Sequence, residues 1–382
     1  MLNMLEDIYS ISMEILRGIM LRYSYLLFFL FLPFLSFVSK ADDIKNSNVS
    51  VDQPFTEKAT RCMGVYLFDL PKEFTVYPGT EFHYDNIRHI VINTQKQDLP
   101  SFKQMIANRK QKLKDTKPIH KIDGNFLKAI YPLSGSNVDK KQGIIFERME
   151  SEGIDDVRRI LEGYRWKDGV TFKIEMKAFN GSASRYDKDR ERYPDVYEND
   201  VSDKLAHMNK LFDRIHARDD FTVPTDVGFC FPNGFMQGGI EEYKEISTLY
   251  RDKNYENLAI TIHSHDYSDE IPLLKEPREP GGHTVYKGKR KNNNMVMEEW
   301  IQKGRYFDRD DHLDDYLPKD KGYLFRLGIN AFDADYKKPQ LRVEMYYILP
   351  RDSSKAYSKK QLMTIWREIT NSIRIRESSF TH

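Results

Sequence analysis

Cysteine is scarce in this chain of 382 residues, which contains only two. Two thiols cannot build a disulfide-dense small scaffold or a four-cysteine structural zinc site. An excess of one charge is missing as well, because 59 Lys and Arg residues are balanced by 58 Asp and Glu residues. The formal net charge of +1 gives no overall field that would favour nucleic acid or an anionic membrane, so any electrostatic recognition must be local.

The usual catalytic and cofactor motifs are also missing. The sequence contains no GxSxG nucleophile elbow, GxxxxGK[ST] phosphate loop, HExxH zinc motif or GxGxxG dinucleotide fingerprint. The acidic run from Asp308 fails as an EF-hand loop, because Leu313 and Lys319 stand where glycine and glutamate are needed. We therefore expect no cofactor and no enzyme activity, although a triad assembled from distant residues would escape this test.

An export signal is predicted near the N-terminus. The apolar run 23–38 is broken by Pro33 and has about the length of a secretory h-region, which is short for a membrane span. The sequence Ser-Lys-Ala that ends at Ala41 precedes two aspartates, which suits signal peptidase. We expect cleavage after Ala41, so that residues 1–41 form a signal peptide and residues 42–60 a linker.

Two alternatives accompany this signal. Residues 1–19 contain three acidic residues, which is unusual for a positive n-region, so Met20 is an alternative true start. The apolar run could also stay uncleaved as a membrane anchor. With cleavage, we expect no stable membrane insertion of the mature chain.

The predicted export bears on the redox state of the two cysteines. An oxidising compartment permits a disulfide between Cys62 and Cys230, which would close a loop of nearly half the chain. In the chain-entropy model such a bond constrains the unfolded state by roughly 5 kcal/mol. The alternative is two free buried thiols.

An internal duplication is indicated by markers that recur in the same order. Residues 84–87 (YDNI) precede an apolar run, and residues 255–258 (YENL) do so about 170 residues later. Residues 172–176 and 341–345 repeat at a similar distance, and so do Cys62 and Cys230. With 40% apolar and 31% charged residues, the chain suits two globular domains.

We therefore predict an α+β fold of two similar domains, each a mainly antiparallel sheet with helices packed on one face. The expected boundaries are 61–222 for the first domain and 223–382 for the second, with the connection near Pro224. Alternating patterns predict strands over Val65–Leu70, Phe74–Tyr77, Ile87–Thr94, Val170–Phe179, Leu258–His263, Tyr323–Phe332 and Gln340–Leu349. Helices are predicted over Leu99–Leu113, Ile154–Tyr164, Leu205–Ile215, Met295–Lys303 and Leu362–Ile373.

Three charged segments are candidates for partner contact. The first is an insertion between Ala183 and Asp203 that the second half lacks, the second a basic excursion within residues 275–294, and the third an acidic run over residues 308–315. Tyrosine suits interface anchors, and local charge fixes the register of an encounter. Solvated faces are the alternative interpretation. The candidate contact residues are Tyr186, Tyr193, Tyr197, Lys289, Arg290, Asp310 and Asp311.

A metal site is a second hypothesis. His263 and His265 lie at the end of a predicted strand and project to one face, so two imidazoles could bind zinc with Asp266 or another oxygen ligand. The duplication places Ile92 and Thr94 at the equivalent positions of the first half. Two surface histidines on a polar strand face are the simpler interpretation.

Short motifs in both halves resemble a bacterial family. Residues 62–71 read CMGVYLFDLP, and Gly228-Phe229-Cys230 opens the second half. This pattern, behind an export signal, resembles the immunity proteins of type VI secreted phospholipase effectors. The resemblance implies two α+β domains that clamp a lipase toxin in the periplasm, with no turnover of their own. It carries over no contact residues, and an exported zinc hydrolase or a solute-binding or structural envelope protein remain as alternatives.

Overall fold

The computed structural model describes residues 57–77, 81–84, 90–133, 142–239, 241–252, 257–269, 271–278, 282–305, 321–350, 352 and 356–380. The chain divides into two compact units, Met1–Asn48 and Val49–His382, and all described residues belong to the second. The predicted signal peptide lies outside them. In the part of the chain that is described, no helix has the length and apolarity needed to cross a membrane.

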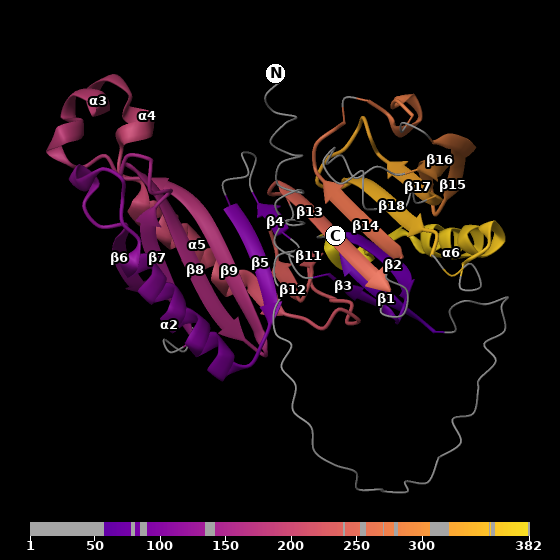
Figure 1. Cartoon of the computed structure of the whole chain (residues 1–382), viewed down its shortest axis with the longest axis horizontal. Coiled ribbons are helices and arrows are strands. Elements are labelled where there is room, and N and C mark those ends of the chain that lie inside the picture. The colour runs from indigo at the N-terminus through magenta and orange to yellow at the C-terminus, as the bar shows by residue number, and fades with distance from the viewer. Residues whose placement is uncertain are drawn as a thin grey trace, which may run out of the picture. The chain divides into compact units, whose positions relative to one another are not determined.

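A 13-stranded antiparallel sheet forms the body of the second unit (Figure 1). Its strand order is β15-β16-β17-β18-β14-β13-β4-β5-β9-β8-β7-β6, and β3 (Phe74–Val76) also pairs with β13. The first half of the chain supplies β4 (Glu81–Tyr84), β5 (Ile90–Lys96), β6 (Leu127–Pro132), β7 (Gly143–Met149), β8 (Arg158–Lys167) and β9 (Val170–Phe179). The second half supplies β13 (Lys244–Asp252), β14 (Leu258–His265), β15 (His283–Asn292), β16 (Met295–Arg305), β17 (Lys321–Ile329) and β18 (Gln340–Ile348).

The two halves have the same strand order, read outward from the pairing of β4 with β13. From that contact the first half runs β4-β5-β9-β8-β7-β6 and the second runs β13-β14-β18-β17-β16-β15. The repeated segments 172–176 and 341–345 lie at equivalent places, in β9 and β18. The predicted α+β fold with two similar, mainly antiparallel domains is therefore confirmed.

Two small sheets are built by exchange of strands between the halves. β1 (Lys58–Met63) and β2 (Tyr66–Pro71) form a hairpin that is completed by β19 (Arg374–Ile375) from the end of the second half. β11 (Gly228–Phe231) and β12 (Gly234–Gln237) form the equivalent hairpin, completed by β10 (Ile215–Ala217) from the first half. Each hairpin thus depends on the other half for its third strand.

A disulfide and two buried arginines bind these small sheets together. Cys62 in β1 is bonded to Cys230 in β11, with the sulfur atoms 1.99 Å apart. Arg218, just after β10, donates to the carbonyls of Cys62 and Phe231 at 3.2 Å each. Arg376, just after β19, donates to the carbonyl of Asp226 at 2.8 Å. Because buried carbonyls need donors, both side chains stabilise the junction.

The helices begin and pack as their sequences direct. α2 (Leu99–Asp115) follows Asp98, whose Oδ1 accepts from the amide of Ser101 at 2.7 Å, and Pro100 occupies its first turn. α6 (Lys359–Ser372) starts with a capping box of Ser358 and Gln361. The remaining helices are α3 (Asp187–Arg192), α4 (Pro194–Tyr197) and α5 (Val201–Arg214), with short 3-10 turns η1 (Lys121–Asp123), η2 (Ser184–Tyr186), η3 (Leu273–Lys275) and η5 (Glu377–Ser379).

Helices cover both faces of the sheet in the first half, in contrast to the expected single face. Gly163 in β8 lies under α5, and a Cβ there would come within 2.5 Å of the Met208 sulfur. Its neighbour Glu162 points to the other face and binds Arg109 of α2. In Figure 1, α2 passes in front of β7 and β8, and α5 lies behind.

Two predicted helices and one predicted loop were wrong. Residues 154–164 and 295–303, expected as helices, lie largely in strands β8 and β16, and the expected excursion 275–294 contains β15. β8 is buried on both faces from Arg159 to Arg165, so its apolar residues do not alternate. Ile160, Leu161 and Tyr164 then reproduce helical spacing, which periodicity alone cannot distinguish from a buried strand.

We predict that neither half folds alone. A fragment of residues 57–218 lacks β19 and also α6, which packs on β2, whereas a fragment of residues 222–380 lacks β10. Each fragment would expose an unpaired strand and an apolar surface. Circular dichroism should show no cooperative thermal transition for either fragment, but co-expression should give a stable complex. A cooperative transition in one isolated fragment would contradict this.

Candidate partner-binding surface

One face of the large sheet stays accessible across the junction of the halves. On β9, β5, β13, β14 and β18, side chains alternate between buried ones on the core side and partly or fully exposed ones on the other side. His83 of β4 continues the accessible row. We call this surface, with the six strands from β9 to β18 as its floor, the open face.

The open face has a border in each half. α2 covers β7 and β8, where Phe102 packs with Phe146 and Tyr164. In the second half the segment around η3 covers β16 and β17. The amide of Leu274 donates to Glu298 at 3.2 Å, and Arg326 of β17 pairs with Glu276 at 2.9 Å. The floor is therefore flanked by structure that each half supplies separately.

The α2 border depends on one buried carboxylate. The side chain of Glu162 is fully buried and accepts from Arg109 Nε and Nη2 at 2.6 Å each, from Arg148 Nε at 2.8 Å and from the Tyr164 hydroxyl at 2.7 Å. Burial would raise the pKa of this carboxyl, but the hydrogen bonds from Arg109, Tyr164 and Arg148 outweigh burial and lower the pKa to about 2. Glu162 is thus ionised at neutral pH.

Charges of both signs and an apolar end characterise the open face. Lys173 and Glu175 of β9 pair at 3.2 Å, and Arg342 of β18 lies 3.6 Å from Glu344. The second-half end exposes Tyr346 and Ile348 of β18, which are 37% and 45% accessible. A broad surface of this composition suits a protein partner better than a small molecule, which would need an enclosed pocket.

The two histidines of the zinc hypothesis lie side by side on β14. Their ring centroids are 5.0 Å apart, as expected for one strand face. His263 Nε2 is 3.2 Å from Glu245 Oε1, and His265 stacks on Tyr267 with its Nε2 3.7 Å from Asp269 Oδ1. Among the described residues no group of three His, Cys, Asp or Glu side chains is placed to hold a metal ion. Each ring thus has an acidic neighbour, and the zinc alternative stays a prediction.

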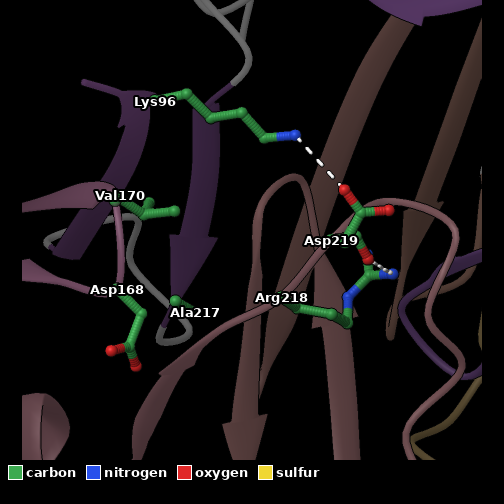
Figure 2. Close-up of a pocket in the computed structure, with 7 residues that line it drawn as sticks. Lys96, Asp168, Val170, Ala217, Arg218 and Asp219 are labelled. Carbon is green, nitrogen blue, oxygen red and sulfur yellow. Dashed lines mark hydrogen bonds and ion pairs between the residues drawn. The ribbon is translucent and has the colours of Figure 1, made fainter. Parts of the chain in front are cut away.

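A small polar pocket lies at the turn between β8 and β9, next to the connection between the halves (Figure 2). Its volume is about 330 Å³, and Lys96, Asp168, Val170, Arg218 and Asp219 line it. Lys96 Nζ points toward the Asp219 carboxylate at 3.7 Å, and Arg218 donates to the Asp219 carbonyl at 3.1 Å.

The predicted contact residues are placed far apart in the fold. Tyr193 is 50% exposed and Tyr197 partly so, but Tyr186 is buried and donates to Asp156 at 2.8 Å. Tyr186 therefore supports its segment from inside. These three residues lie at the end of the first half that carries α3 and α4.

The basic residues lie on the hairpin of β15 and β16. Lys289 is exposed and pairs with Glu298 at 2.9 Å, whereas Arg290 is mostly covered and donates to Asn371 of α6 at 2.7 Å. Arg290 thus attaches the hairpin to α6. Asp310 and Asp311 lie outside the described residues. These contact residues remain a prediction.

Sequence reasoning missed the open face itself. Its central strand β13 reads KEISTLYRD and alternates between buried and accessible positions over its whole length. That period of two was the available signal. Its pairing with β4, more than a hundred residues away in the chain, left no local trace in the sequence.

Comparison with known proteins gives two adjoining family matches. Residues 59–218 match the Tle cognate immunity protein 4 N-terminal domain, and residues 222–378 match the C-terminal domain of the same family. No curated protein matches the chain.

Solved structures share the fold at low sequence identity. The apo immunity protein TplEi of the T6SS from Pseudomonas aeruginosa is 17% identical, with a TM-score of 0.61 over 86% of this chain and 100% of that one. The Tle4–Tli4 complex contains a chain that is 16% identical, with a TM-score of 0.61 over 84% of this chain and 98% of that one. TplEi with an "L" peptide is 14% identical, with a TM-score of 0.56 over 84% and 99%.

We predict that Glu162→Gln loosens the α2 border. Without the charge, Arg109 and Arg148 lose their buried partner, which should lower the free energy of unfolding by about 3 kcal/mol. Because the pKa of Glu162 lies below its ordinary 4.5 in the folded state, its contribution is complete above that pH and is lost as pH falls toward 2. The stability difference between wild type and variant, measured by urea unfolding, should therefore shrink over that range.

The control is Asp115→Asn, at the exposed end of the same helix, which should change the stability by less than about 0.5 kcal/mol. Hydrogen exchange should report faster opening of α2 in Glu162→Gln alone. A variant as stable as wild type at pH 7 would contradict the assigned role.

Proposed function

Since the chain belongs to the Tle cognate immunity protein 4 family, we propose that it binds a phospholipase effector of a type VI secretion system and blocks it. The observation that carries this proposal is the match of both family domains, in order, over nearly all described residues. The names of its structural relatives agree, because TplEi is an immunity protein of the T6SS and Tli4 was solved in complex with Tle4. The proposed action is stoichiometric binding without turnover.

The open face is the proposed contact surface for the effector. Six strands about 4.8 Å apart span about 24 Å, and strands of eight residues are about 26 Å long, which gives a floor of roughly 600 Å². The two borders add to this area, so the surface approaches the roughly 800 Å² per partner of a standard stable interface. Each half supplies three floor strands and one border. We therefore propose that the two domains clamp the effector by presenting this joint surface to it.

Rigidity supports an inhibitory role for this surface. Each of the six strands is held by a paired neighbour on both sides, and the core side is filled with buried residues. A preformed surface loses little conformational entropy on binding, so more of the contact energy appears as affinity. The exposed loops and charges around it would then contribute register and on-rate.

Export to the periplasm is the proposed location. The predicted signal at residues 23–41 supports it, and so does the disulfide between Cys62 and Cys230, since structural disulfides persist in oxidising compartments. An effector that attacks phospholipids from that side would meet the inhibitor there.

We predict that the mature chain inhibits its cognate lipase at a ratio of one to one.

Thr261 lies in the middle of β14 on the open face, between Leu249 and Glu344 of the adjacent strands. Thr261→Arg should weaken effector binding by about tenfold or more, which corresponds to about 1.4 kcal/mol. The reason is that a long charged side chain would project from the floor of the open face toward the effector. Titration calorimetry measures the stoichiometry and the affinity of binding, and a lipase assay measures the inhibition.

Thr364→Arg, on the exposed side of α6, is the matched control and should bind and inhibit like wild type. Both variants should unfold at the wild-type temperature. A wild-type chain that neither binds nor inhibits the lipase would refute the proposed function, whereas full binding by Thr261→Arg would refute only the open face as its surface.

We predict a mature N-terminus at Asp42. Protein recovered from the periplasmic fraction should begin with Asp42-Asp43 in N-terminal sequencing, and its two cysteines should resist alkylation until it is reduced. Ala41→Asp, which puts a charge where a small residue is needed, should block this cleavage, whereas Lys40→Arg should not. A periplasmic product that retains residues 23–38 would show an anchor instead.

A further inference from the structure

We propose that the far end of the first half is a second contact surface for the effector, an inference that rests on the proposed function. Four apolar residues stand out there: Ile119 is 69% exposed, Ile122 74%, Tyr193 50% and Val196 37%. They lie on the connection after α2 and on the segment from η2 to α4. We call them, with the charged residues beside them, the apical surface, and it lies beyond the ends of β7, β8 and β9 rather than on the open face.

The apical surface is where the two repeats differ most. The strands of the halves correspond one to one, yet α2 and the segment with η2, α3 and α4 occur in the first half only among the described residues. In the second half, the connection from β14 to β15 contains only the short η3 among its described residues, and the connection from β18 to α6 is much shorter. Figure 1 shows α3 and α4 at this end of the first-half strands. Structure added to one copy of a repeat calls for a role that the scaffold alone does not explain.

A partly buried polar network holds this surface in place. Asp156 accepts from the Tyr186 hydroxyl at 2.8 Å and from Lys128 Nζ at 3.1 Å, and it pairs with Arg185. Arg185 also pairs with the buried Asp123 at 2.7 Å, so one guanidinium joins the β7–β8 turn, η1 and η2. Because one guanidinium pairs with two carboxylates, it holds these three segments together.

Hydrogen bonds hold the backbone of both exposed isoleucines. The carbonyl of Ile122 accepts from Arg185 Nη1 at 3.0 Å, and the amide of Ile119 donates to the carbonyl of Glu152 at 2.8 Å. Their side chains nevertheless point to solvent. This exposure is unfavourable, because water must hydrate apolar surface that a flexible loop could bury. An apolar centre on a rigid, polar base is the anatomy of a protein interface, and preorganisation lowers the entropic cost of binding.

The charges around the apical surface favour a protein over a membrane. Lys117 and Lys121 lie beside the isoleucines, and Glu152 and Asp155 lie on the adjoining turn, all four of them exposed. An anionic bilayer would attract only the cationic pair and repel the acidic one. A rim of both signs instead suits a folded partner with its own mixed charges, and the effector is the partner that the proposed function supplies.

The test compares effector binding by wild type with that of the double variant Ile119→Asp/Ile122→Asp in the full mature chain. Charges in the apolar centre should speed dissociation, measured by surface plasmon resonance with the purified effector, by about tenfold or more. The control is Val296→Asp, which replaces an apolar residue of the second half that is 47% exposed. This variant should dissociate from the effector at the wild-type rate. Unchanged melting temperatures show that the variants are folded.

Hydrogen exchange gives an independent readout of the same contact. In the complex, the amides of residues 116–124 and 187–198 should exchange more slowly than in the free chain, and this protection should be lost in the double variant. Wild-type binding with an unchanged double variant and no protection would overturn the apical surface and leave the proposed function intact. Failure of the wild type to bind would refute the proposed function itself.

The same double variant distinguishes the effector from two other possible partners of the apical surface, a membrane and a second copy of this chain. Co-sedimentation with phosphatidylglycerol vesicles that the double variant loses, with effector binding unchanged, would overturn the proposal in favour of a membrane. Loss of self-association in analytical ultracentrifugation, with effector binding unchanged, would overturn it in favour of a second copy of this chain.

Discussion

The antiparallel pairing of β4 with β13 is the contact on which the other features depend. It joins two six-strand arrays at the edge that each would otherwise expose to solvent, and an exposed edge invites association with other chains. Aromatic rings reinforce the contact from the core side, where Phe82 of β4 packs against Phe229 and Phe231 at centroid distances of 5.4 and 5.2 Å. Because β4 and β13 are neighbours in one sheet, the accessible face of one half adjoins that of the other.

The exchanged strands turn this contact into an obligate one. A hinge between independent domains would let the open face bend, but here β10 and β19 cross to the opposite half. Arg218 donates to the carbonyl of Phe231 there, and the amide of Arg376 donates to the carbonyl of Val65. The sequence therefore encodes two repeats that form one body. An inhibitor benefits from this arrangement, since the surface offered to the enzyme is set before the enzyme arrives.

Local patterns allowed the repeats and the terminal helices to be predicted, because these signals lie within short stretches of sequence. The apolar spacing of Met208, Leu211 and Phe212 indicates α5, and the same spacing from Leu362 to Ile373 indicates α6. β8 and β16 were missed for a physical reason: strands covered on both faces lose their alternation. The open face was missed because it arises from pairing between strands far apart in the chain, which composition does not record.

The cysteines lie at equivalent positions of the two hairpins. Cys62 pairs with Leu67 across β1 and β2, and Cys230 pairs with Phe235 across β11 and β12 in the matching register. The disulfide therefore joins matching positions of the two repeats. One covalent bond thus constrains both hairpins at the same point of their fold.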